Sequence, residues 1–102
     1  MSGSTVEERP QADTRPLLVF FTERTSGPAR RMASLVAWIG VSQKRRVRVC
    51  EVDIGANPRL ARRLGVSRAP TVVLLKERRI VGRLEGRATG GQIQRLIEPH
   101  VT

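Results

Sequence analysis

Runs of apolar residues along the chain predict the strands of a sheet. The uninterrupted run LLVFF at residues 17–21 is typical of a strand that is buried on both faces. Later stretches rich in β-branched residues favour strands at residues 47–54, 69–75 and 79–85. The connector KERR between the last two leaves room only for a hairpin, although it lacks the Gly or Asn that tight hairpins favour.

Apolar residues between the first two strands recur at helical spacing. Pro28 suits the first turn of a helix, where its missing N–H is not needed, and Gly40 is expected to end that helix. The apolar stripe between them consists of Met32, Leu35, Val36 and Ile39. Because this helix joins the two strands, we expect them to be parallel and the crossover to be right-handed. Trp38, beside the stripe, is interpreted as flanking the core.

Shorter helices follow in the second half of the chain. Asn57 is expected to cap a helix that ends at Gly65. Thr89 and Gln92 match the capping-box pattern at the start of the last helix, which should stop near Pro99. The order strand–helix–strand–helix–strand–strand–helix predicts an α/β fold, with a mixed sheet and helices on both of its faces.

The length of the chain, 102 residues, suits one domain. Residues 1–15 are polar and predict a disordered tail, which leaves residues 16–102 for the domain. We find no signal-peptide pattern and no apolar run that approaches the roughly 20 residues needed to span a bilayer. The single cysteine, Cys50, cannot form an internal disulfide, which suits a reducing compartment. These features predict a cytoplasmic protein that does not insert into membranes.

The chain is strongly basic, with 19 Lys and Arg against 9 Asp and Glu and a net charge of +10. Such a charge attracts polyanions, including nucleic acid and acidic proteins. The alternative is a solvated basic surface with no specific ligand, and both interpretations stay open. One Cys and one His cannot form a zinc site, and no phosphate-binding or dinucleotide glycine pattern is present. We therefore expect no metal and no cofactor.

Several short motifs, in this order and at this spacing, resemble the thioredoxin family. LLVFFTERTSGPARRM resembles the active-site segment, in which a strand leads into Cys-Gly-Pro-Cys and a helix. EVDIGANPRLARRLGVSRAPTVVLLKERRIVGRLEG resembles the remainder, and the match covers residues 16–102. The resemblance implies a minimal thioredoxin-like fold. Its mixed sheet would have four strands in the order two-one-three-four, with strand four antiparallel to strand three, and a cis peptide bond before Pro70.

The family's two cysteines fall on Ser26 and Ala29, which flank Gly27 and Pro28. We interpret these four residues as a vestigial active-site loop. The family's chemistry needs a thiolate at a helix N-terminus, where the helix dipole lowers its pKa. A serine hydroxyl stays protonated without a strong base, and alanine cannot resolve a mixed disulfide. The buried acid of many members falls on Phe20. Dithiol–disulfide exchange is therefore not expected, and no catalytic residue is assigned.

What remains of the site predicts a place for peptide or anion binding. In the family, the residue before the cis-proline pairs its backbone with an extended peptide, and here that residue is Ala69, next to Pro70. Arg24, Arg30 and Arg68 lie one or two residues from the loops that would meet there. A helix start with unpaired N–H groups and several guanidinium groups favours an anionic or acidic ligand.

Three functions follow from these features. The leading hypothesis is a non-redox module that binds an extended or acidic segment of a partner protein near Ser26 and Pro70. The second is association with nucleic acid through the net charge, which would depend strongly on salt. The third is a thiol-dependent enzyme, in which Ser26 activates a thiol such as glutathione or Cys50 itself reacts.

The second strand raises two further questions. Cys50 lies in the middle of it, and we interpret the thiol as buried and inert, with a redox role as the alternative. The fold expected here leaves this strand, residues 47–54, at an edge of the sheet, which suggests a homodimer through that edge. Arg45, Arg46 and Arg48 would oppose such pairing by their charge.

Overall fold

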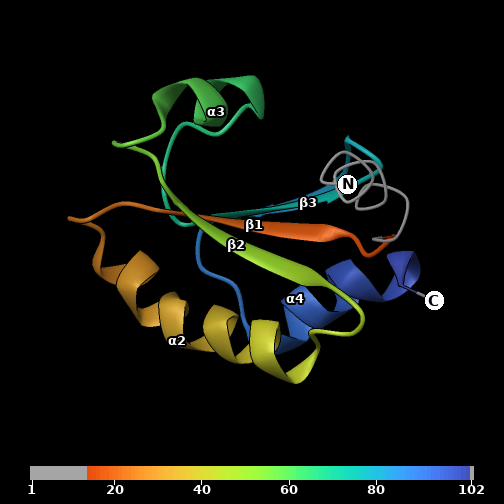
Figure 1. Cartoon of the computed structure of the whole chain (residues 1–102). Coiled ribbons are helices and arrows are strands. Elements are labelled where there is room, and N and C mark those ends of the chain that lie inside the picture. Colours follow the sequence, from red (N-terminus) through yellow and green to blue (C-terminus); the bar gives the residue numbers. More distant parts are fainter. Residues whose placement is uncertain (1–13, 102) are drawn as a thin grey trace, which may run out of the picture.

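The computed structural model describes residues 14–101 (Figure 1). Most of the predicted tail, residues 1–13, lies outside the described part of the chain, as does residue 102. The elements are β1 (Leu17–Thr22), α2 (Gly27–Ser42), β2 (Arg48–Asp53), α3 (Pro58–Arg63), β3 (Thr71–Lys76), β4 (Arg79–Glu85), α4 (Gly90–Ile97) and the 3-10 turn η1 (Glu98–His100).

The strands form one mixed sheet in the order β2-β1-β3-β4. β1 is parallel to β2 and antiparallel to β3, and β4 is antiparallel to β3. α2 and α4 lie on one face of this sheet and α3 lies on the other (Figure 1). The expected α/β class, strand order and strand directions are confirmed.

Each face of the sheet carries its own apolar core. Leu18 and Phe20 of β1 pack with residues of α2 and α4 on one side, and Val19 and Phe21 pack with residues of α3 and Val66 on the other. All four of these β1 side chains are buried. β1 is therefore buried on both faces, which explains why its apolar run is uninterrupted rather than alternating.

The end of α2 differs from the expectation. The helix continues past Gly40 to Ser42, so the prediction that Gly40 ends it was wrong. A Cβ at Gly40 would lie 3.2 Å from the Cβ of Val49, closer than side chains normally approach. Glycine at this position lets α2 lie directly against β2. Its role is a close approach between two elements and not a helix stop.

The two later helices show why some expected caps form and others do not. Thr89 Oγ1 accepts from the Gln92 N–H at 3.1 Å, and Gln92 Oε1 accepts from the Thr89 N–H at 2.8 Å, which confirms the capping box. Asn57 precedes α3, but its side chain makes no cap bond and donates instead to the carbonyl oxygen of Asp53. The side-chain cap expected there was wrong. Gly65 follows α3 with a φ of 72°, as expected for a helix end.

The hairpin between β3 and β4 has an unusual turn. Glu77 and Arg78 connect the strands with φ angles of 54° and 70°, both in the left-handed region. Two-residue hairpin turns of this kind favour Asn and Gly, because other side chains clash with the backbone there. For an ordinary residue the left-handed conformation costs roughly 1–2 kcal/mol.

We expect the double substitution Glu77→Asn, Arg78→Gly to raise the free energy of unfolding by about 1–2 kcal/mol, because it relieves both strained positions. Urea denaturation followed by circular dichroism measures this change. Arg87→Gly is the matched control, since Arg87 is an exposed loop residue whose φ is not positive. That substitution should lower stability slightly. A double variant less stable than the parent protein would contradict the assignment of the turn.

Candidate functional site

The loop between β1 and α2 holds the residues that align with the lost cysteines. The Ser26 N–H donates to the carbonyl oxygen of Glu23 at 3.0 Å, which closes the turn. Ser26 is the N-cap of α2, and its Oγ accepts from the Ala29 N–H at 3.1 Å. The hydroxyl oxygen of Ser26 therefore has a structural role as a helix cap.

Ala29 lies inside the core and has no reactive atom. Its exposed fraction is 0 %, and it belongs to the apolar cluster between α2 and the sheet. Ser26, Gly27 and Pro28 are half-buried. The four residues thus form the start of a helix, and none of them carries a thiol.

The loop that enters β3 is held on both sides. The peptide bond between Ala69 and Pro70 is cis. The carbonyl oxygen of Pro70 accepts from the Gly86 N–H at 2.8 Å. Thr71, only 2 % exposed, donates its hydroxyl to the carbonyl oxygen of Arg68 at 2.8 Å. These bonds fix the backbone on either side of Ala69.

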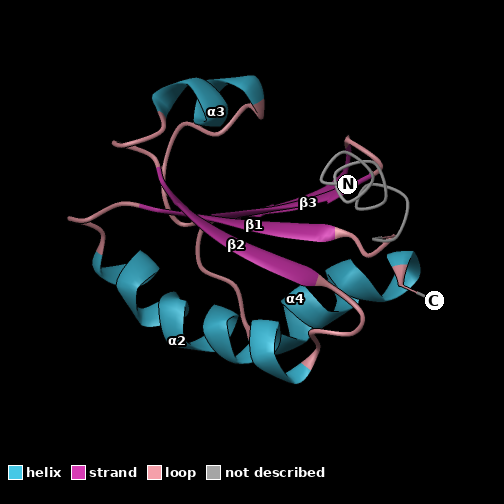
Figure 2. Cartoon of the chain, in the orientation of Figure 1, coloured by secondary structure: helices cyan, strands magenta, loops and turns pink. Residues whose placement is uncertain are grey.

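The strand register brings the two loops to the same end of the sheet. Thr71, the first residue of β3, pairs with Phe21 near the end of β1, and α2 begins a few residues later. Figure 2 shows this at the left, where the loop from β1 to α2 and the loop into β3 leave the same end of the strands. The vestigial loop and Pro70 are therefore neighbours in the fold, as the resemblance implies.

Ala69 presents backbone groups that the fold leaves open. Its side chain is half-buried, and within residues 14–101 its N–H and C=O make no hydrogen bond. Its neighbours do make such bonds, through the carbonyl oxygens of Arg68 and Pro70. A donor and an acceptor are thus available on a rigid backbone segment at this end of the sheet.

The start of α2 offers fewer open N–H groups than expected. The Ala29 N–H bonds to Ser26 Oγ, and the Arg30 N–H bonds to the Ser26 carbonyl oxygen at 3.1 Å. Pro28 has no N–H. Among the residues that open the helix, Gly27 keeps the one N–H with no partner in the described chain. Of the unpaired N–H groups expected here, the structure leaves one open, because the serine caps the helix.

Exposed arginines lie in the loops at this end of the molecule, where the exposed Glu23 also lies next to Arg24. Arg24, Arg30 and Arg68 are all exposed and form no ion pair with any of residues 14–101. The first turn of α2 contains no acidic residue. A Cβ at Gly27 would lie 3.6 Å from Arg31 Nη1, so this guanidinium folds back over the helix start.

Arg31 was not among the site residues predicted from the sequence. The signal was its spacing, because a side chain four residues after Gly27 lies on the same face of the helix. Helix starts favour acidic groups, whereas this one has no acidic residue in its first turn and has Arg24 just before it and Arg30 and Arg31 after it. The arrangement is suited to accept a carboxylate from outside the chain.

Cys50 is not part of this site. It lies in the middle of β2 opposite Val19, away from the strand ends where the two loops meet. The thiol is exposed, so the expectation of a buried cysteine was wrong. β2 is an edge strand, and the apolar cluster on this face includes Val52 but stops short of Cys50. Trp38 is likewise 64 % exposed instead of flanking the core.

Two other classes of site are not found in the described part of the chain. No group of three or more His, Cys, Asp and Glu side chains is placed to hold a metal within residues 14–101. Over the same residues, no helix has the length and apolar character needed to cross a membrane.

Comparisons with known proteins agree with this fold. The family model Thioredoxin matches residues 3–99. A thioredoxin-like protein from Synechocystis sp. is 28% identical over 87 residues, which cover 85% of this chain and 83% of the relative. Thioredoxin 1 from Nostoc sp. is 25% identical over 101 residues, covering 99% of this chain and 94% of the relative.

The fold is also that of a solved structure. The X-ray structure of Fasciola hepatica thioredoxin superposes with a TM-score of 0.79 at 24% identity, covering 97% of this chain and 93% of the other. At that identity the likeness concerns the fold, and the family model carries the assignment. The chain therefore belongs to the thioredoxin family.

Proposed function

We propose that this protein is a non-redox member of its family that binds an extended, acidic segment of a partner protein at the end of the sheet where Ser26 and Pro70 lie. The observation that carries the proposal is the open N–H and C=O of Ala69, held between two bonded neighbours and next to the exposed Arg68. An extended segment can pair with such a backbone as a short added strand. We also propose that it acts in the cytoplasm, where a lone thiol stays reduced.

The rigid frame around Ala69 supports backbone recognition. Thr71 and Gly86 fix the carbonyl groups on either side of it through bonds of 2.8 Å. A partner strand that pairs with Ala69 would therefore not have to order this loop first. Pre-organisation of this kind reduces the entropic cost of binding.

The charges around the loop support an acidic partner. Arg24, Arg30 and Arg68 have no acidic partner among residues 14–101, and the dipole of α2 adds partial positive charge at the same end. Arginine forms paired hydrogen bonds with a carboxylate, which favours Asp or Glu in the bound segment. The net charge of +10 would also speed the approach of an acidic protein.

The binding test uses a short fluorescein-labelled peptide of alternating Glu and Val, followed by fluorescence anisotropy. We expect the double variant Arg30→Glu, Arg68→Glu to weaken binding about tenfold or more, because each reversal replaces an attraction of about 1 kcal/mol with repulsion. Arg79→Glu, Arg95→Glu is the matched control, since it changes the net charge equally on the exposed hairpin and α4. It should change binding less than about threefold.

Equal weakening by the two double variants would contradict the proposal, because it would mean that the peptide responds only to net charge. Nucleic acid, the other polyanion that the net charge attracts, is tested in the same assay. If a single-stranded oligonucleotide binds more tightly than the peptide, and its binding falls steeply with salt, nucleic acid is the better candidate.

A further inference from the structure

The outer edge of β2 has open backbone groups in a defined pattern. The Arg48 N–H donates to the Pro16 carbonyl oxygen and the Ile54 N–H to that of Thr22, each at 2.9 Å. The N–H and C=O groups of successive strand residues point to opposite edges of the strand. The backbone groups of the even-numbered residues of β2 therefore point toward β1. Val49 and Glu51 therefore turn their N–H and C=O groups outward, where no described residue bonds to them.

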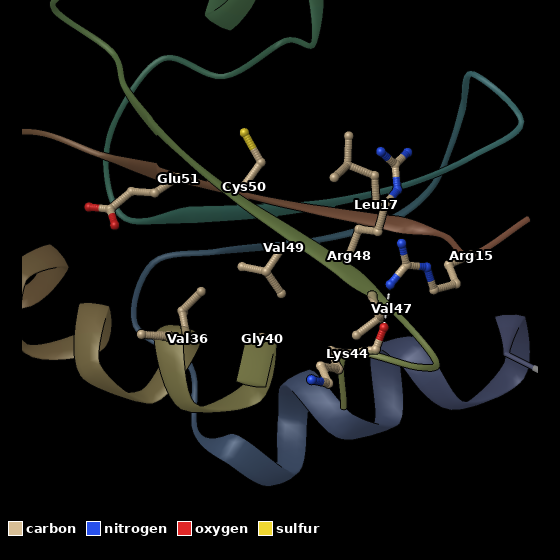
Figure 3. A pocket seen from close by; sticks show the side chains of 11 residues that line it. Arg15, Leu17, Val36, Gly40, Lys44, Val47, Arg48, Val49, Cys50 and Glu51 are labelled. Atoms are coloured by element: carbon tan, nitrogen blue, oxygen red, sulfur yellow. Dashed lines mark hydrogen bonds between the residues drawn. The ribbon is translucent and has the colours of Figure 1, made fainter. Parts of the chain in front are cut away.

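A hollow of about 650 Å³ runs along this edge between β2 and α2 (Figure 3). Its middle is apolar, with Val36, Gly40 and Val49 along the sides. Glu51 lies at one end of the hollow and Lys44 lies at the other (Figure 3). The edge thus has an acidic end and a basic end on either side of an apolar centre.

This pattern is complementary to itself. If two such edges meet antiparallel, the acidic end of each lies beside the basic end of the other, so that Glu51 of each copy approaches Lys44 of the other. We propose that a second copy of this chain docks along β2 in this way and extends the sheet across a two-fold axis. This surface is separate from the site at Ala69, and the inference does not rest on the proposed function.

The geometry selects the register of the two strands. In an antiparallel pair, the side chains of directly opposed residues lie on the same face of the sheet. The two-fold axis must therefore pass between two copies of the same residue, and not between two successive residues of a strand. An axis through Glu51 would place two carboxylates face to face, which is unfavourable. An axis through Cys50 instead places Val49 of each copy opposite Glu51 of the other, and both outward-facing pairs can exchange hydrogen bonds.

The next pair along the strand also favours an axis at Cys50. The Val47 N–H already bonds to Gln43 at 3.0 Å, and the Asp53 carbonyl oxygen already accepts from the Asn57 N–H at 3.0 Å. With the axis at Cys50, Val47 faces Asp53 of the second copy. The groups still open are the C=O of Val47 and the N–H of Asp53, which can bond to each other. With the axis at Val49, Val47 would face Glu51 and leave a carbonyl group of Glu51 without a donor.

The proposed register places the two Cys50 side chains directly opposite each other. They form a non-hydrogen-bonded pair, in which the Cα atoms are about 4.5 Å apart. That separation lies within the range that a disulfide spans. Cys50, which is exposed, can therefore report the register.

Sedimentation equilibrium at physiological ionic strength tests the interface, because salt then screens the repulsion between the two basic copies. We expect reversible dimers for the parent protein. Glu51→Pro removes an outward N–H without touching the bonds to β1, and should weaken the dimer about tenfold to a hundredfold. Glu51→Thr is the matched control that keeps this N–H, and it should weaken the dimer much less. A parent protein that stays monomeric at high concentration would overturn the proposal.

Disulfide trapping tests the register. Oxidised glutathione first forms a mixed disulfide with one Cys50 and releases one glutathione thiol. The second Cys50 thiolate then displaces the other glutathione, leaving a disulfide between the copies. Two control variants lack Cys50 through Cys50→Ser and carry a single cysteine elsewhere, introduced by Val49→Cys or by Arg95→Cys. The parent protein should cross-link at least about tenfold faster than either control. Equal rates at positions 49 and 50 would overturn the register, and equal rates at all three would overturn the interface.

Discussion

Replacing both Ser26 and Ala29 with cysteine should create disulfide reductase activity at the start of α2. The residue at position 26 is the N-cap of α2, where the Ala29 N–H and the helix dipole would stabilise a thiolate and lower its pKa from about 8.5 to about 7 or below. Position 29 lies one turn further along, inside the core, where a second thiol could resolve a mixed disulfide. Reduction of insulin by dithiothreitol, followed as turbidity, measures the gain.

Two single variants control this experiment. The double variant and both controls carry Cys50→Ser, which removes the third thiol. Ser26→Cys alone should form mixed disulfides but not turn over, because no second thiol resolves them. Ala29→Cys alone should be nearly unreactive, because that position is buried. If the parent protein already reduced insulin above background, the interpretation of residues 26–29 as a vestigial loop would be wrong.

Phe20→Asp should lower the free energy of unfolding by more than about 4 kcal/mol. The substitution removes a phenyl side chain that is 0 % exposed, a loss that alone costs roughly 3–5 kcal/mol. It also places a carboxyl group among apolar neighbours that include Leu18, Val72 and Ile93. A small domain has only about 5–15 kcal/mol of stability, so much of the variant should be unfolded at 37 °C.

Urea denaturation at neutral pH measures the loss, with Phe20→Leu as the control. Leucine keeps most of the apolar volume, and we expect it to cost about 1 kcal/mol. An aspartate variant as stable as the leucine variant would mean that water reaches position 20, contrary to the burial seen here. The position to which the resemblance assigns the family's buried acid is thus filled by an aromatic ring inside the core.

The features that the sequence predicted well depend on neighbours in the chain. The apolar run of β1, the capping box at Thr89 and the left-handed Gly65 each involve a few consecutive residues, whose chemistry is enough to set the local structure. The strand order followed from the family resemblance and was confirmed.

The features that the sequence did not predict depend on contacts between distant segments. Glycine is a residue type that often ends a helix, which is why Gly40 was predicted to do so. Its close contact with Val49 exists only in the folded chain, where α2 packs against β2. The exposure of Cys50 depends on how far the core beneath α3 extends along the sheet. The strained turn at Glu77 and Arg78 is set by the pairing of β3 with β4, against the preference of both residues.

The candidate site was predicted in part. The meeting of the two loops was implied by the resemblance, whereas the engagement of the Ser26 hydroxyl in the helix cap and the open backbone of Ala69 needed the structure. Hydrogen bonds of single groups are not visible in a pattern of residue types, because the same serine could have pointed to solvent.

The serine at the start of α2 has a consequence for how this protein would respond to its surroundings. A pair of thiols at this place alternates between two chemical forms, and whatever binds there can be released by oxidation. A hydroxyl oxygen that holds the Ala29 N–H has one form only. Oxidation therefore cannot change the chemical form of this position, and a complex formed beside it would lack the redox control that a pair of thiols provides.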